Sequence, residues 1–226
     1  MFFPAKMNAI RISLDFYHQL FKLEKKTTTA TRPTMQINEL IHTRRSIRRF
    51  RQESIPIEIL RDIVDAARVA PSASNLQPLR YVLIYDKSLV ERVFPHTKWA
   101  AYLPADSGRP PAGQEPTAYV IILIDEEIAT QWVGHDVGAA TENMILTALD
   151  NGIGSCWIAS LNRPELKQVL VMPAAYRIDS ALALGYPDET PVIEVLQRSV
   201  EYYRDEEGCL HVPKRSLGDI LFENSF

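Results

Sequence analysis

The chain has 226 residues, of which 46% are hydrophobic, and it carries a net charge of −3 with a sequence pI near 6.0. This length and apolar content support one sizeable core. The slightly acidic balance argues against a protein built to hold nucleic acid, which is normally basic. No stretch approaches the roughly 18 uninterrupted apolar residues of a membrane-spanning helix, and the N-terminus lacks the pattern of a signal peptide.

The two cysteines, Cys156 and Cys209, lie far apart in the sequence. They form no CxxC pair and show no metal-ligand spacing, so we predict no metal site. Free thiols are typical of a reducing, cytoplasmic setting, which we therefore expect. A single disulfide between them is the alternative.

Residues 1–34 differ in character from the rest of the chain. Four apolar residues share one face at helical spacing, and a polar stretch rich in Lys and Thr follows them. We expect a helical or partly disordered extension here, ahead of one domain over residues 35–226. A translation start at Met35 is a second interpretation, and a helix that binds a membrane surface or a partner is a third.

From residue 36 onward, apolar periodicity predicts alternating helices and strands. The predicted helices are 37–43, 54–70 with a stop at Pro71, 87–94, 133–152 and 163–170. The predicted strands are 80–86, 118–125, 155–160 and 180–187. Residues 96–116 read as a long loop. The nearly all-apolar strand 118–125 indicates a central position, and the helix 133–152 is apolar on more than one face, which is typical of a buried or dimer-interface helix.

The cluster RRSIRRF spans Arg44 to Phe50. Guanidinium groups bind phosphate through paired, charge-assisted hydrogen bonds, and the hydroxyl of Ser46 adds a donor. A phosphomonoester therefore suits this cluster. A solvated basic face after a helix is the alternative.

The segment APSASNLQP, residues 70–78, places Ser72, Ser74, Asn75 and Gln77 between two prolines. Asn and Gln side chains offer a donor and an acceptor side by side, which suits the imide-like edge of a flavin. An ordinary turn after a helix is the alternative.

Two later segments are less specific by themselves. NGIGSCWIAS, residues 151–160, places glycines before a strand that contains Trp157, and glycine allows close approach of backbone to a planar ligand. VPKRS, residues 212–216, is a late pair of cations. The polar pair His135 and Asp136 begins the helix 133–152, where capping is the expected role, and Cys156 is expected to be a small core residue.

In this order, RRSIRRF, PSASNLQP, GIGSCWI and HVPKRSL resemble the nitroreductase family of FMN enzymes, over nearly the whole chain from Met35 onward. The resemblance implies an α+β fold, with a central and mostly antiparallel sheet flanked by helices, in an intertwined homodimer. Two FMN molecules would lie at the dimer interface. NADH or NADPH would be the electron donor and a small molecule the acceptor, with no nucleic acid or membrane as partner.

The resemblance also implies roles for particular residues. Arg44, Arg45 and Ser46 would grip the FMN phosphate and ribityl chain, and Arg48 would reach the pyrimidine edge of the flavin. Lys214 and Arg215 would complete the phosphate site, whereas Arg49 and Arg51 are expected to be surface charges only. The remaining expected contacts come from the loop of the other subunit and from the strand along the flavin: Pro71, Ser72, Ala73, Ser74, Asn75, Gln77, Trp157, Ile158 and Ala159.

The sequence departs from the family pattern in three places. The region HTKWAAYL, residues 96–103, offers no clear counterpart of the Asn that often contacts the flavin ring. Ala159 stands where some members carry an acidic residue. The segment 98–116 is short, and it leaves little material for a substrate lid.

The function predicted from this resemblance is transfer of hydride from NAD(P)H through flavin N5 to a nitroaromatic, quinone or similar conjugated acceptor. Flavin carries such chemistry itself, so no catalytic side chain is assigned. The alternatives on the same fold are reductive dehalogenation, flavin fragmentation and enoyl-type reduction. A flavin-binding protein without turnover and a basic nucleic-acid module are alternatives of other classes.

Overall fold

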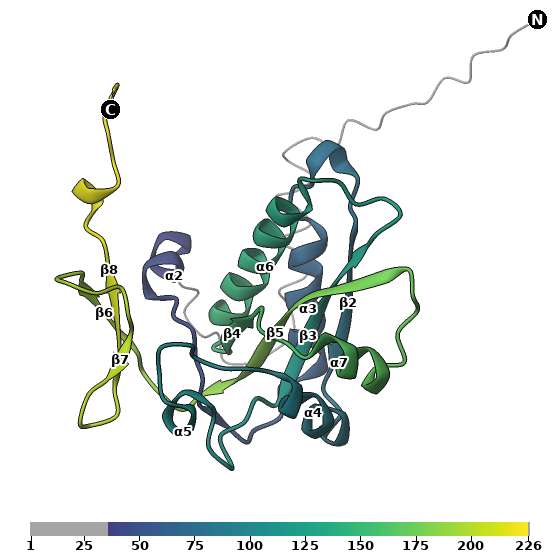
Figure 1. The fold of residues 1–226 in the computed structure, drawn as a ribbon, viewed down its shortest axis with the longest axis horizontal. Coiled ribbons are helices and arrows are strands. Elements are labelled where there is room, and N and C mark those ends of the chain that lie inside the picture. Colours follow the sequence, from purple (N-terminus) through teal and green to yellow (C-terminus); the bar gives the residue numbers. More distant parts are fainter. Residues whose placement is uncertain (1–35, 226) are drawn as a thin grey trace, which may run out of the picture. The chain divides into compact units, whose positions relative to one another are not determined.

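A computed structural model of the protein describes residues 36–225 (Figure 1), so the predictions for residues 1–34 and for Met35 lie outside the described residues. The main sheet has five strands. At its centre, β5 (Tyr176–Pro187) pairs on one side with β3 (Ala118–Asp125) and on the other with β4 (Gly154–Ile158) and β1 (Phe50–Arg51). The strand β2 (Leu79–Ile84) pairs with β3. All four pairings are antiparallel, which confirms the predicted sheet.

Helices cover both faces of this sheet. Alternate residues of β3, from Ala118 to Ile124, pack under α3 (Ile57–Arg68) and α6 (Val133–Asp150). The residues between them, from Tyr119 to Leu123, pack under α4 (Lys87–Val93) and α7 (Arg163–Val169). Successive side chains of a strand point to opposite faces, so β3 is buried on both sides. Its seven residues Ala118–Ile124 are all buried, and the prediction of a central strand is confirmed.

The predicted helix 133–152 is present as α6, which packs against α3 (Figure 1). Its buried residues include Val137, Met144 and Ala148, whereas Leu146 and Leu149 are only half-buried in the single chain. The helix is therefore buried on one broad face.

Several boundaries differ from the predictions; for example, α3 begins at Ile57 rather than at residue 54, and β5 begins at Tyr176 rather than at residue 180. Helix α3 ends at Arg68, two residues before the predicted last helical residue, Ala70. Strand β2 ends at Ile84, because the carboxylate of Asp86 accepts the backbone N–H of Leu89 and so begins α4.

The regions that gave weak patterns also contain structure. The segment predicted as a long loop contains the short helix α5 (Ala105–Gly108). The 3₁₀ turn η2 (Phe94–His96) lies at the start of this segment. Ahead of the main sheet, α2 (Ile37–Thr43) confirms the first predicted helix. The C-terminal segment, for which no element was predicted, forms a second sheet and a final turn. These elements are β6 (Val192–Val195), β7 (Tyr203–Arg204), β8 (Leu210–Lys214) and the 3₁₀ turn η3 (Leu217–Asp219).

Candidate cofactor site

The basic cluster lies directly beside strand β4. The backbone N–H of Ile47 donates to the carbonyl of Ser155 at 2.8 Å, and Ser46 and Ser155 form a parallel β-bridge. A Cβ on Gly154 would lie 2.9 Å from Cγ1 of Ile47, so only glycine allows this approach. The structure thus joins two of the four predicted motifs, RRSIRRF and GIGSCWI.

Guanidinium groups of this cluster are partly withdrawn from water. Nε of Arg45 and Nε of Arg48 are buried and have no hydrogen-bond partner among residues 36–225. Burial lowers the pKa of Arg45, and the neighbouring positive charge of Arg44 lowers it further. A buried cation without full compensation is costly, so an anion at this place would supply the missing partners.

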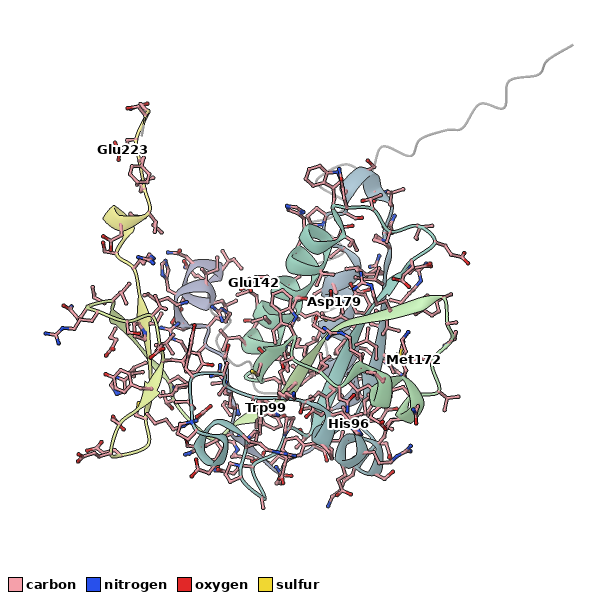
Figure 2. All side chains as sticks on the ribbon, viewed as in Figure 1. His96, Trp99, Glu142, Met172, Asp179 and Glu223 are labelled. Carbon is pink, nitrogen blue, oxygen red and sulfur yellow. The ribbon has the colours of Figure 1, made fainter. Side chains whose placement is uncertain are left out.

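The other arginines of the cluster differ in their surroundings. Arg44 forms an ion pair of 3.6 Å with Glu142 on α6 (labelled in Figure 2). The guanidinium of Arg48 lies over the ring of Tyr202, 5.0 Å from its centroid. Arg51 is exposed and pairs with Glu53, as expected of a surface charge. For Arg49 that expectation is wrong, because its Nε is buried, also without a hydrogen-bond partner among the described residues.

The backbone of the basic cluster is also held from the C-terminal segment. The N–H of Arg48 donates to the carboxylate of Glu189 at 2.5 Å. Glu189 forms an ion pair of 2.7 Å with Arg204, and the two side chains are only 7% and 8% exposed. Sequence reasoning missed this pair, since nothing in the local pattern relates an acid in a turn to an arginine 15 residues later.

The loop 71–77 is attached to the first turn of α6. The hydroxyl of Ser72 donates to Oδ2 of Asp136 at 2.8 Å, and the N–H of Ala73 donates to Oδ1 at 2.9 Å. Asp136 is only 5% exposed. The prediction that Asp136 caps its own helix is wrong, because Asp136 lies inside the first turn and its carboxylate accepts hydrogen bonds from the loop. The structure gives it the role of holding this loop.

The tip of the same loop presents polar groups to solvent. Ser74, Asn75 and Gln77 have φ values of 51°, 55° and 53°, a conformation in which L residues other than Asn are uncommon. The exposed amides of Asn75 and Gln77 lie together, with Nε2 of Gln77 donating to Oδ1 of Asn75 at 3.2 Å. Pro71 is also exposed. Among the described residues, no hydrogen bond joins this loop to the basic cluster of the same chain.

A cavity of about 490 Å³ lies behind this loop, between α3 and β2. Its lining includes Ser72, Tyr81 and Asp136, and burial together with Asp136 raises the pKa of Tyr81 to about 12. The remaining lining is mostly side chains of α3 and β2, and none of it comes from Arg44–Arg48. The cavity is therefore separate from the candidate phosphate site.

Strand β4 presents an open face beyond Ser155. Trp157 is 43% exposed, and its indole N–H donates to the hydroxyl of Ser180 at 2.7 Å. That hydroxyl donates to Asp179 at 2.8 Å, which is labelled in Figure 2. Cys156 and Ile158 point into the core on the opposite face, and burial raises the pKa of the Cys156 thiol. The prediction that Cys156 is a core residue is confirmed.

The end of β4 is fixed by Arg163, which sequence reasoning also missed. Its guanidinium donates to the carbonyl of Ala159 at 2.9 Å and to that of Ile178 at 3.0 Å. Ala159 is itself exposed. The backbone that follows Trp157 and Ile158 is thus held at Ala159 by a side-chain hydrogen bond.

Lys214 and Arg215 lie at the end of β8 and are both exposed. The carbonyl of Lys214 accepts the N–H of Leu196, and the charge of Arg215 contributes to a lowered pKa of Asp219, whose main cause is the hydroxyl of Ser216. In the part of the chain that the structure describes, no hydrogen bond or ion pair connects either cation to Arg44–Ser46. Within one chain, the fourth motif is therefore not joined to the first.

The sequence of the chain is similar to proteins of one known family. Residues 41–186 match the nitroreductase family. The chain belongs to the nitroreductase family. A relative from Archaeoglobus fulgidus, provisionally named NADH dehydrogenase/NAD(P)H nitroreductase, is 31% identical over 67% of this chain and 85% of its own length. The iodotyrosine deiodinase of Thermotoga neapolitana is 25% identical over 67% of this chain and 88% of its own.

The fold of this nitroreductase-family chain also matches solved structures. A protein from Desulfovibrio desulfuricans, provisionally described as a nitroreductase in complex with FMN, has a TM-score of 0.62 and 24% sequence identity. The similarity covers 87% of this chain and 99% of that one. This confirms the predicted α+β fold.

The family match includes three of the four motifs. Residues 41–186 include the basic cluster, the loop 71–77 and β4, but they end before Lys214 and Arg215. Within residues 36–225, no helix combines the length and the apolar content that crossing a membrane requires.

Proposed function

We propose that this nitroreductase-family chain is an FMN-dependent oxidoreductase. It would pass hydride from NADH or NADPH to a nitroaromatic, a quinone or a similar conjugated acceptor. One observation carries the proposal: Ser46 pairs with Ser155, which brings the backbone of the basic cluster beside β4, and in this cluster Nε of Arg45 and Nε of Arg48 are buried without a hydrogen-bond partner among the described residues. A phosphate site next to an open strand face suits a phosphorylated planar molecule.

The charge and chemistry of the residues present support FMN as the ligand. The unpartnered Nε atoms of Arg45 and Arg48 suit the phosphate and polar edges of FMN. Glycine at position 154 brings the cluster within contact of β4. Trp157 leaves the outer face of the strand partly open, and the backbone there is held by Arg163. The arginines of the basic cluster therefore suit the phosphate of FMN, and the open side of β4 at Trp157 suits its ring system.

The proposed roles follow the motifs. Arg44, Arg45 and Ser46 bind the phosphate and ribityl chain, and Arg48 binds the pyrimidine edge. The backbone of Trp157–Ala159 lies along the ring system. The loop Pro71–Asn75, with Gln77, comes from the second subunit of a homodimer. Lys214 and Arg215 complete the phosphate site.

FMN, when bound, supplies the atom that accepts and then donates hydride, so the protein needs no acid or base at a fixed place. The task of the chain is to bind, orient and shield. Asp136 holds the loop, and Arg163 holds the end of β4. The dimer is supported by Leu146 and Leu149 of α6, which are only half-buried within one chain. The free thiols of Cys156 and Cys209 suit a cytoplasmic protein.

Reductive dehalogenation is the second candidate function. It is favoured by one observation, the similarity to the iodotyrosine deiodinase of Thermotoga neapolitana. Both reactions need the same FMN site and differ in the acceptor. A halogenated aromatic substrate therefore belongs in the same panel as quinones and nitroaromatics.

The absorption spectrum of the purified protein is the first test. We expect the bands of an oxidised flavin, released as FMN on denaturation, and their loss on addition of NADH or NADPH without oxygen. A colourless protein that takes up no FMN would refute the proposal. A flavin that neither nucleotide can reduce would instead indicate a flavin-binding protein without turnover.

The residue assignment has its own test. We expect Arg44→Ala combined with Lys214→Ala to weaken FMN binding by at least about tenfold, or ~1.4 kcal/mol. Arg51→Ala is the matched control, because Arg51 is an exposed arginine of the same segment paired with Glu53. If the double variant binds FMN as the wild type does, the phosphate assignment is wrong.

A further inference from the structure

The hairpin that joins β7 to β8 brings together three side chains of a kind that bind metal ions. Asp205, Cys209 and His211 each offer one ligand atom, and these atoms all lie within 4.8 Å of one another. The cluster is half-buried, and it lies beyond residues 41–186 that match the family. None of the three residues is among those assigned to the proposed FMN site, although His211 lies on β8, as Lys214 does.

The backbone of the turn sets the position of Asp205. The turn closes through the N–H of Gly208, which donates to the carbonyl of Asp205 at 3.0 Å, with a φ of 82° at Gly208. One carboxylate oxygen of Asp205 accepts the N–H of Cys209 at 2.8 Å. The other oxygen, Oδ2, lies 2.9 Å from Nε2 of His211. One oxygen thus orients the carboxylate, and the other faces the cluster.

The imidazole of His211 is held from its far side. Its Nδ1 lies 3.2 Å from Oε2 of Glu194. Tyr203 stacks on the ring at 4.9 Å with an interplanar angle of 9°, and its hydroxyl donates to the same oxygen of Glu194 at 3.1 Å. Histidines that bind metals usually have their other ring nitrogen hydrogen-bonded to a carboxylate in this way. The ring is fixed with Nε2 directed at Asp205.

We propose that Asp205, Cys209 and His211 bind one divalent transition-metal ion, for which Zn²⁺ is the best match. A thiolate, an imidazole nitrogen and a carboxylate oxygen are the three ligand types that Zn²⁺ accepts, whereas Mg²⁺ and Ca²⁺ avoid sulfur. The ion displaces the proton shared by His211 and Asp205 and the thiol proton of Cys209. Water fills the fourth position. The ion ties the turn to β8.

The test uses the untagged full-length protein, stripped with a chelator and then titrated with Zn²⁺ in a calorimeter. We expect one Zn²⁺ per chain. Co²⁺ in its place should give the visible bands of a tetrahedral site and a thiolate-to-cobalt charge-transfer band. No stoichiometric binding would overturn the proposal, and His211 would then serve only as an ionic partner of Asp205 and Glu194.

Variants separate the ligands from their supports. Cys209→Ser keeps the His211–Asp205 pair and should abolish the charge-transfer band, while Cys156 stays buried in the core. His211→Gln should prevent binding, and Glu194→Gln should weaken it about 10- to 100-fold. His42→Gln, an exposed histidine on α2, is the matched control and should change nothing. Unchanged Zn²⁺ affinity in both Cys209→Ser and His211→Gln would place the ion elsewhere and refute the assignment.

Discussion

The carboxylate of Asp136 ties helix α6 to the loop 71–77, because its Oδ2 accepts the hydroxyl of Ser72 at 2.8 Å and its Oδ1 accepts the N–H of Ala73. Asp136→Ala leaves both donors without a partner in a nearly buried place. We expect the free energy of unfolding to fall by about 1–3 kcal/mol. Urea denaturation at fixed protein concentration measures this, since a dimer would make the stability depend on concentration.

Glu142→Ala is the control for Asp136→Ala on the same helix. Glu142 is exposed and pairs with Arg44 at 3.6 Å, so its removal should change stability by no more than about 1 kcal/mol. Equal losses in the two variants would contradict the role assigned to Asp136. A larger loss in FMN affinity for Asp136→Ala would further support the proposed role of the loop.

Gly154→Ala tests whether the contact between the basic cluster and β4 is needed. The new methyl group would lie 2.9 Å from Ile47, so Ile47 and the cluster around it must move. Overpacking of this kind costs about 1–3 kcal/mol. We also expect FMN affinity to fall about tenfold, or ~1.4 kcal/mol, because Ser46 and the neighbouring arginines Arg45 and Arg48 move with Ile47.

Gly134→Ala is the matched control, because a Cβ at that exposed position of α6 meets nothing within 4 Å. Alanine is the better helix former, so this change should leave stability equal or slightly higher. Calorimetric FMN titration and thermal denaturation of both variants make the comparison. Unchanged FMN affinity in Gly154→Ala would show that the contact does not position the site.

Much of the fold could be predicted because its elements bury regular patterns. The run Ala118–Asp125 is apolar at every position but the last, which fits only a strand covered on both faces. The C-terminal sheet gave no such signal, since β6–β8 are two to five residues long and bury few side chains. Short strands of this kind depend on partners from distant parts of the chain, and no local pattern encodes them.

Only part of the candidate site could be predicted from the sequence. The basic cluster and GIGSCWI were predicted as parts of one site, and the pairing of Ser46 with Ser155 brings them together. Asp136 and Glu189 were misassigned or missed because their roles come from contacts across 64 and 141 residues of sequence, and Arg163 was missed although one of its two carbonyl partners, Ala159, is only four residues away. A carboxylate at a helix start reads as a cap until the structure shows that a loop lies above it.

The pH dependence of stability can be predicted at Asp86, which begins α4. The hydroxyl of Ser88 and the N–H of Leu89 hydrogen-bond to this carboxylate and hold its pKa below the ordinary value. The charged carboxylate therefore stabilises the fold at pH values above its unfolded-state pKa of about 3.9. This contribution is lost as the pH falls through the lower pKa that Asp86 has in the folded state. Asp86→Ala should therefore be less stable than the wild type at neutral pH, and the difference should shrink in acid.

Asp62→Ala is the control for Asp86→Ala. Asp62 is an exposed carboxylate of α3 that forms no hydrogen bond or ion pair within the described residues, so its replacement should give little pH-dependent difference. Thermal denaturation of the three proteins between neutral pH and about pH 3 measures the effect. A difference for Asp86→Ala that stays constant over this range would show that the charged cap is not its cause.

The ion pair of Glu189 and Arg204 gives the largest expected loss of stability. Both side chains are nearly buried, and Glu189 also accepts the backbone N–H of Arg48. Glu189→Ala leaves a buried guanidinium without its anion and should cost about 3–5 kcal/mol.

The double variant Glu189→Leu with Arg204→Met removes both charges and should recover most of this loss. It should not recover all of it, because the N–H of Arg48 still lacks an acceptor, at a cost of about 1–3 kcal/mol. Urea denaturation of the two variants and the wild type checks the order. If the double variant is less stable than Glu189→Ala, the buried charges contribute net stability, and the desolvation argument for this pair is wrong.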